Sequence, residues 1–341
     1  MNLTLAHETW FLQNPENYDW GFLGEGATLA LLGAALVLTL AVRLVNRVWD
    51  GVDIGWLAAM APYVPFAIRL HLAVSLIGLI SLGYYLSPAM DLQTDVAGIA
   101  LGAVMAVVAI GMATGYRARA AAWLLIAAGP LGMLEFGVDP VLQRIDVLGL
   151  AAFIVIAGPG RWSADLERGV EADRFRAGAR LDNRNLEILA RAIFALRIAA
   201  GSALIIVALY EKLINPQLAL DFLREHPDLQ LAHQLGLPLS DLEFIRLAGA
   251  VEVLFGLLLI SGALPQAIIL IAGIPFNATL WFFGINELVG HLPIYGAMLA
   301  ILVFGSHPQL RSTVYGWGRP ANRLSGGSPS VKTPARPSVG E

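Results

Sequence analysis

Long apolar runs separated by short polar stretches dominate the sequence. Nine of them are about 17–22 residues long, enough for an α-helix to cross a hydrocarbon core of about 30 Å. They fall near residues 26–45, 65–86, 96–115, 119–136, 142–158, 191–212, 244–262, 265–284 and 291–306. The pattern predicts an all-α polytopic membrane protein with about nine transmembrane helices.

Composition supports a protein that lies mostly in lipid. Of the 341 residues, 57% are hydrophobic and 14% are charged, whereas a soluble domain carries about 25% charged residues. The chain has no cysteine, which excludes disulfides, iron–sulfur ligation and thiol redox chemistry. We expect the bilayer, and no nucleic acid, as a partner.

The distribution of charge between the loops predicts the orientation. Cytoplasmic loops carry an excess of Lys and Arg. With an external N-terminus, alternation of nine helices places these arginines inside: Arg43, Arg47, Arg117, Arg119, Arg161, Arg168, Arg174, Arg176, Arg180, Arg184 and those of the tail from Arg311 to Arg336. The leader and the loop 213–243 are then acidic external segments. We expect a multi-pass protein of a prokaryotic plasma membrane, with its N-terminus outside and its C-terminus in the cytoplasm.

Two windows of the sequence match each other without a gap at an offset of 147 residues. Residues 102–158 and 249–305 contain eight glycines each. If eight glycines were placed at random in each window, about one pair would coincide at a given offset. Five pairs coincide: Gly102/Gly249, Gly115/Gly262, Gly137/Gly284, Gly149/Gly296 and Gly158/Gly305. The match predicts two parallel four-helix bundles related by an axis along the membrane normal, plus an N-terminal transmembrane helix.

This organisation predicts five segments. Residues 1–60 form an external leader, the first helix and a cytoplasmic loop, and residues 61–160 form a diverged first repeat. Residues 161–190 form a charged cytoplasmic linker, and residues 191–307 form the second repeat. Residues 308–341 form a cytoplasmic tail whose Gly, Ser and Pro content predicts disorder.

The second repeat carries a motif built around one intramembrane acid. Its parts are Arg197, Glu211–Lys212, Asn215–Pro216, the run Gly249–Gly262 with Glu252, and the stretch Phe283–Pro293. This motif resembles the DoxX family of prokaryotic four-helix membrane proteins, some of which are subunits of thiosulfate:quinone oxidoreductases. The resemblance implies a quinone as cofactor and a soluble redox or sulfur-handling protein as partner. The residues themselves indicate no cofactor.

Glu252 is the strongest candidate for a functional residue. It lies about eight residues into its predicted helix, or about 12 Å below the outer end. A carboxylate at that depth costs several kcal/mol unless it is paired or protonated. Lys212 ends the preceding helix and can reach it through a stem of about 6 Å, so we expect these two to pair. The alternative interpretation is an ion pair that only locks the bundle.

Three more polar residues, His291, Glu287 and Arg246, lie near the same outer face. A histidine within reach of Glu252 can relay protons or donate a hydrogen bond to a quinone carbonyl, although interfacial histidines are also common without such a role. We expect these residues to converge with Lys212 and Glu252 on one outer-leaflet site.

Glycine and proline predict two departures from straight helices. Gly129–Pro130 and Gly273–Pro275 should interrupt the third helices of the two repeats, and such paired breaks often mark a cavity. In the outer loop, Pro216–Arg224 is amphipathic and should lie on the membrane surface.

Other residues fit structural roles. Arg69 and Arg197 start equivalent helices, which predicts a packing or lipid-headgroup role, and Glu211 ends the sixth predicted helix. The external histidines His7, His226 and His233 have no spacing typical of a metal site, so we predict no metal.

Three functions remain open from the sequence. The first is a membrane subunit of a quinone-linked redox complex, with an outer-leaflet pocket for a quinone or similar ligand. The second is a proton-coupled transporter that uses Glu252, and the third is a non-catalytic membrane scaffold. Whether the protein is an enzyme is left undecided.

Overall fold

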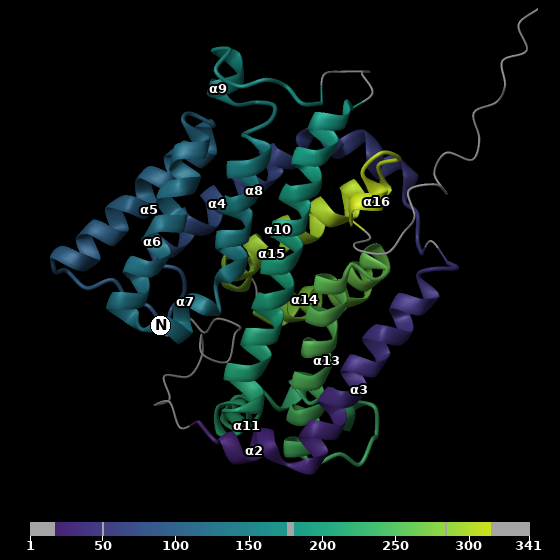
Figure 1. Cartoon of the computed structure of the whole chain (residues 1–341). Helices are drawn as coiled ribbons and strands as arrows, with labels where there is room; N and C mark the ends of the chain where they lie inside the picture. Colours follow the sequence, from purple (N-terminus) through teal and green to yellow (C-terminus); the bar gives the residue numbers. More distant parts are fainter. Residues whose placement is uncertain (1–17, 50, 176–180, 284, 315–341) are drawn as a thin grey trace, which may run out of the picture.

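Helices are the only regular elements in the described part of the chain. The computed structural model describes residues 18–49, 51–175, 181–283 and 285–314, and no β-strand occurs among them (Figure 1). In chain order the elements are α2 (Trp20–Gly24), α3 (Gly26–Val45), η1 (Gly55–Tyr63), α4 (Val64–Ser81), α5 (Val96–Thr114), α6 (Ala118–Phe136), α7 (Val138–Leu142), α8 (Ile145–Ala157), α9 (Ala164–Glu167), α10 (Asn183–Ala208), η2 (Leu209–Leu213), α11 (Pro216–Glu225), η3 (Pro227–Leu229), α12 (Leu231–Gln234), α13 (Asp241–Ser261), α14 (Pro265–Phe283), α15 (Ile285–Ser306) and α16 (Arg311–Val314).

Seven described helices are long and apolar enough to cross a membrane. They are Gly26–Val45, Gly55–Ser81, Val96–Thr114, Ala118–Phe136, Asn183–Leu213, Asp241–Ser261 and Leu288–Ser306. Two further apolar helices are shorter, Ile145–Ala157 and Pro265–Leu280. Each of the nine predicted runs therefore contains a helix, and the prediction of an all-α polytopic membrane protein is confirmed.

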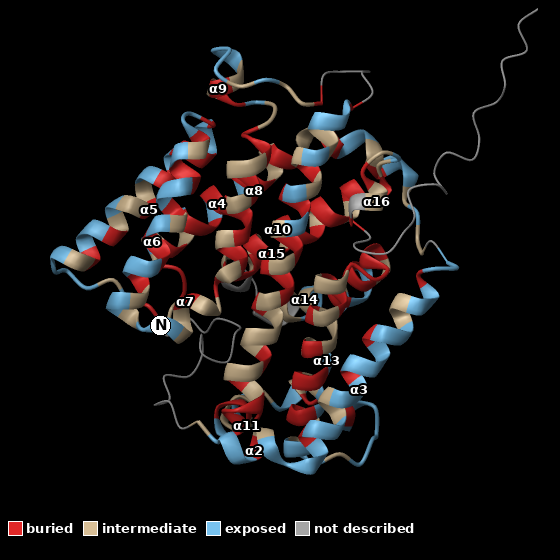
Figure 2. Cartoon of the chain, viewed as in Figure 1, coloured by how far each residue is buried: buried red, intermediate tan, exposed pale blue. Residues whose placement is uncertain are grey.

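Four helices occupy the centre of the bundle. α10 packs along α8, and α15 packs along α4. α5 and α6 flank α4 and α8 on one side, whereas α13 and α14 flank α10 and α15 on the other. Figure 2 shows that buried residues concentrate on the central helices. Each half of the chain thus contributes its first and fourth helices to the shared core.

The first long helix, α3, lies outside this core along α13. Thr28 Oγ1 accepts a hydrogen bond from Arg246 near the start of both helices, and Arg43 donates to the Ser261 carbonyl near their ends. The two helices therefore run parallel. Most of α3 is exposed in Figure 2, and its large apolar side chains, such as Val37 (64% exposed), form a surface suited to lipid.

The two ends of the bundle differ, and we name them by their elements. The leader end carries α2, α7 and α11, and the linker end carries α9 and α16 (Figure 1). Nine described arginines lie at or near the linker end: Arg43, Arg69, Arg117, Arg119, Arg161, Arg168, Arg174, Arg197 and Arg311. The charge asymmetry of the sequence is thus an asymmetry between the two ends of the fold.

Local features recur at positions 147 residues apart. α5 and α13 end at glycines in the left-handed conformation, Gly115 (φ 66°) and Gly262 (φ 68°). Two residues later, Arg117 (φ 47°) and Leu264 (φ 41°) are also left-handed, although neither is glycine. Two of the three non-glycine residues with positive φ in the described chain therefore occupy corresponding turns.

A side-chain bond recurs in the same way. Arg119 at the start of α6 donates to the Val155 carbonyl of α8. Gln266 at the start of α14 donates to the Leu302 carbonyl of α15 over 3.3 Å. The two donors are 147 residues apart in the sequence, and so are the two acceptors.

Two expectations from the sequence are wrong. α6 and α14 continue through Pro130 and Pro275 without interruption, because a proline removes one backbone donor from a helix whose other bonds persist. The expected membrane-surface helix is α11, but its Ala219 and Leu223 are buried in a cluster with Ile245 of α13. Its apolar face therefore packs on the protein.

Candidate functional site

Lys212 lies on a π-helical turn that ends the α10 span. The helix changes at Ala208 into η2, which holds Tyr210, Glu211 and Lys212. π turns are rare and occur frequently at functional sites. Glu211 is 1% exposed, so its side chain is buried in the protein, whereas Lys212 projects toward α13.

Lys212 and Glu252 form an ion pair. Lys212 Nζ lies 3.3 Å from Glu252 Oε1, and their side chains are 14% and 34% exposed. Glu252 lies about 16 Å along α13 from its first residue, well inside the apolar span. The predicted pairing of these two residues is confirmed.

A glycine brings the two elements close enough for this contact. Gly249 precedes Glu252 by one turn, and a methyl group on it would lie 2.8 Å from Leu213 Cδ2 and 3.3 Å from Lys212 Cβ. A larger residue at that position would push α13 away from η2. In the first half, the position of Glu252 is taken by Met105, which is fully buried, and the position of Lys212 is taken by Tyr84.

Arg246 faces a different partner. Its guanidinium pairs with Glu25, donates to Thr28 Oγ1 over 3.0 Å and lies 4.5 Å from the Phe22 ring centroid. Six residues separate Arg246 from Glu252, which places them about 120° apart around α13. Arg246 therefore holds the leader and α3 against α13.

His291 is buried on α15, with 4% of its surface exposed. Its ring packs edge-to-face on Phe276 (4.9 Å) and Tyr295 (6.1 Å). These rings belong to α14 and α15, whereas Glu252 pairs with Lys212 of η2. The side chain of Glu287 lies outside the described residues. Of the five residues expected to converge, the structure joins Lys212 and Glu252.

The leader contacts the turn that carries Lys212, which sequence reasoning missed. Tyr18 packs edge-to-face on Tyr210 at 5.6 Å and donates to Asp139 of α7 over 2.9 Å. The backbone of Asp19 donates to the Ile214 carbonyl over 2.7 Å. The pairing of Glu25 with Arg246 could have been found by matching charges at equal depth in two helices that start at the same face.

Arg69 and Arg197 are buried at the linker end. Arg69 donates to the carbonyls of Met112 (2.6 Å), Pro159 (2.9 Å) and Trp162 (2.7 Å). Arg197 donates to those of Val314 (2.5 Å) and Ile260 (3.2 Å). The last carbonyls of a helix have no partner within the helix, and these arginines bind them. Both side chains are enclosed in the protein, so the contacts that the structure shows for them are with its backbone carbonyls, as the packing interpretation expects.

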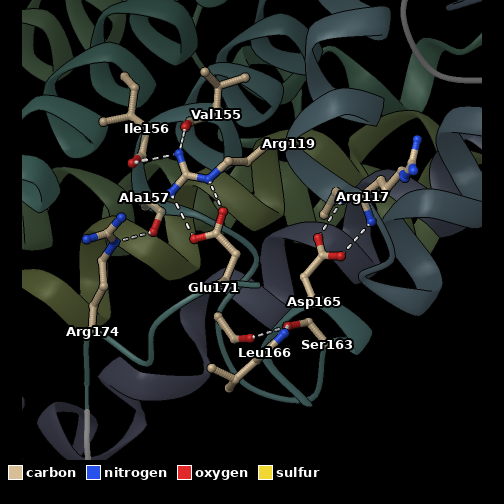
Figure 3. A network of polar contacts seen from close by, with 12 residues as sticks. Arg117, Arg119, Val155, Ile156, Ala157, Ser163, Asp165, Leu166, Glu171 and Arg174 are labelled. Carbon is tan, nitrogen blue, oxygen red and sulfur yellow. Dashed lines mark hydrogen bonds and ion pairs between the residues drawn. The ribbon is translucent and has the colours of Figure 1, made fainter. Parts of the chain in front are cut away.

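A polar network fixes the linker onto the ends of α6 and α8 (Figure 3). Both carboxylate oxygens of Asp165 accept backbone bonds, from Arg117 (2.8 Å) and Ala118 (3.0 Å). Glu171 pairs with Arg119, and Arg174 donates to the Ala157 carbonyl over 2.7 Å. Burial, followed by the charge of Arg119, lowers the pKa of Arg174. Residues 163–174 of the linker thus cap this end of the bundle.

Comparison of the chain with protein-family models, with curated proteins and with solved structures found no match. Among the described residues, no group of three or more His, Asp or Glu side chains is placed to hold a metal ion. Lys212 and Glu252 form an ion pair inside the apolar part of α13.

Proposed function

We propose that this protein is a membrane subunit of a quinone-linked redox complex. In this proposal Lys212 and Glu252 bind a quinone, or another lipid-soluble ligand with hydrogen-bonding oxygens, in the outer leaflet. The observation that carries the proposal is the ion pair itself, inside an apolar span and with the Glu252 side chain 34% exposed.

The exposure of the pair supports access from the bilayer. A charged side chain on a membrane helix is costly unless it is paired or faces a polar group. Glu252 is paired on one side and open on the other, so a ligand dissolved in lipid can approach it without entering the core. The Lys212 ammonium can donate to a quinone carbonyl, and the Glu252 carboxylate can exchange a proton with the quinol.

Electrons in this proposal come from a soluble redox or sulfur-handling partner. The resemblance of the second half to the DoxX family supports this assignment. The concentration of arginines at the linker end supports a cytoplasmic location for that end, with the N-terminus outside a prokaryotic plasma membrane.

We also infer that the two halves are copies of one four-helix unit. The paired left-handed turns at Arg117 and Leu264 support this, as do the equivalent bonds from Arg119 and Gln266. On that basis the Lys–Glu pair belongs to one copy alone, because Tyr84 and Met105 occupy the matching positions in the other.

Co-purification of quinone from native membranes tests the function. Mass spectrometry should find near-stoichiometric quinone with the wild-type protein and at least about tenfold less with Glu252→Gln, since one charge-assisted hydrogen bond is worth a factor of this order. Glu187→Gln is the matched control, because Glu187 pairs with Arg191 on an exposed face of α10.

A second variant separates binding from folding. Replacing a buried ion pair by apolar residues of similar size often preserves stability, so Lys212→Met/Glu252→Leu should fold and lose the quinone. A folded double variant that keeps the wild-type amount of quinone would rule out this site, and so would background quinone in the wild-type protein.

A scaffold without a ligand is the second candidate function. The observation in its favour is that two charged residues of α13 also join neighbouring elements to this helix. Glu252 binds Lys212 of η2, and Arg246 binds Glu25 beside α3.

A rocking transporter is less favoured, because the halves meet through close glycine contacts, such as Gly149 against Ala199, that rocking would have to separate.

A further inference from the structure

A cluster of two arginines and a tyrosine lies at the linker end, away from the Lys212–Glu252 pair. Arg168 Cζ lies 4.7 Å from the Tyr116 ring centroid, and Arg117 Cζ lies 5.7 Å from it. Both arginines are exposed, and Tyr116 is 44% exposed. From these contacts we propose that Tyr116, Arg117 and Arg168 bind the phosphate of an anionic phospholipid headgroup.

The position of the cluster is fixed at a membrane boundary. Gly115, Tyr116 and Arg117 form the short turn between α5 and α6, both of which are long enough to span a bilayer. A turn of three residues between two spans must lie at the membrane surface. Trp162 follows nearby on the linker, is 62% exposed and packs on Tyr63 at 4.9 Å. Exposed aromatic residues of this kind are enriched at headgroup level.

The two charges repel each other unless an anion lies between them. Because both contact one ring, they lie within about 10 Å of each other, close to one Debye length. Among the described residues, neither arginine forms an ion pair with a carboxylate. Asp165 is nearby, but its two oxygens are occupied by backbone amides. The acid beside Arg168 is Glu167, which is exposed to solvent.

The local backbone holds Arg117 in place for this role. Its φ of 47° is unfavourable for a residue with a side chain, and the bond from its amide to Asp165 stabilises it. Figure 3 shows its side chain directed away from that carboxylate. The corresponding turn of the second half contains Ala263 and Leu264, which are 0% and 6% exposed. The same turn is therefore buried in one half and carries an exposed Tyr–Arg pair in the other.

The chemistry of the cluster favours an anionic lipid. A guanidinium binds phosphate through two parallel N–H···O bonds. A zwitterionic headgroup would also bring a cation next to two arginines. Anionic lipids are concentrated at the cytoplasmic face, where the arginine distribution places this end.

Native mass spectrometry in phosphatidylcholine nanodiscs that contain phosphatidylglycerol tests the proposal. Each arginine near anionic lipid contributes about a fivefold factor in affinity, so Arg117→Gln/Arg168→Gln should bind phosphatidylglycerol about 25-fold more weakly. Arg191→Gln is the control, because Arg191 is an exposed arginine already paired with Glu187. Thermal unfolding should be unchanged in both, since these side chains are exposed.

Three results would overturn the proposal. The first is equal retention of phosphatidylglycerol by the wild type and the double glutamine variant. The second is an equal loss in Arg191→Gln, which would indicate an effect of total charge. The third is displacement of the lipid by excess inorganic phosphate, which would indicate a site for a soluble anion.

Arg117→Lys/Arg168→Lys should bind phosphatidylglycerol with intermediate affinity, because lysine keeps the charge without the planar fork. Full affinity in this variant would contradict phosphate binding by the guanidinium fork.

Discussion

Gly149 of α8 packs directly against Ala199 of α10, so that a methyl group on Gly149 would lie 2.2 Å from Ala199 Cβ. The corresponding contact joins Gly296 of α15 to His71 of α4, where the same distance would be 3.2 Å to His71 Cβ. These two helix pairs form the interface between the halves. The interface therefore depends on the absence of a side chain at two equivalent positions.

This packing predicts that Gly149→Ala destabilises the protein. The added methyl must separate α8 from α10, and overpacking of this kind costs about 1–3 kcal/mol. Gly33→Ala is the control, because nothing lies within 4 Å of that position on α3, and alanine there should be neutral or stabilising by up to about 1 kcal/mol. Unfolding in detergent measures both, and Gly149→Ala/Ala199→Gly should recover part of the loss. A stable Gly149→Ala protein would show that the helices are not in close contact.

The buried guanidinium of Arg197 predicts a second large effect. Arg197→Met leaves the carbonyls of Ile260 and Val314 without these donors in an apolar setting, and the loss should be about 3 kcal/mol or more. Arg197→Lys should not rescue it, because an ammonium lacks the planar fork that reaches two separate carbonyls. Arg191→Met on the exposed face of the same helix should change stability by less than about 0.5 kcal/mol. Equal effects of the two methionine variants would contradict the packing role.

His307 predicts an acid-dependent loss of stability. Burial lowers its pKa below 6.5 in the folded protein, and the neutral ring accepts a bond from the Gln309 amide through Nδ1 over 3.3 Å. As pH falls below about 6.5, the unfolded chain binds a proton that the folded chain excludes, so stability decreases. Above that pH the group has no effect. Between pH 7.5 and 5.5, the melting temperature of His307→Gln should fall less than that of the wild type. An identical fall in both proteins would exclude His307 as a cause.

Much of the architecture was accessible from the sequence because the bilayer imposes strict rules. Apolar runs of sufficient length must be helical, and an acid within a span needs a partner at its own depth. Glu252 and Lys212 satisfied that rule on neighbouring helices, so their pairing was predictable without coordinates.

The remaining features of the site depend on how each helix is rotated about its axis and on which side chains it contacts. Hydropathy encodes neither. Arg246 and Glu252 are close in sequence, yet they have different partners because their side chains point about 120° apart around α13. The π turn at η2 inserts a residue that no composition pattern reveals, and it buries Glu211 next to Lys212, whose side chain faces Glu252. Pro130 and Pro275 suggested breaks, but the surrounding helical bonds keep both helices continuous.

The proposal of a quinone site at Lys212 and Glu252 is tested most directly by photoaffinity labelling. A photoreactive quinone analogue should be added to native membranes, and the labelled peptides identified by mass spectrometry. We predict label on η2 and on the α13 turn around Glu252, reduced about tenfold in Lys212→Met/Glu252→Leu. Label confined to other helices, or equal label at this site in the double variant, would contradict the assignment.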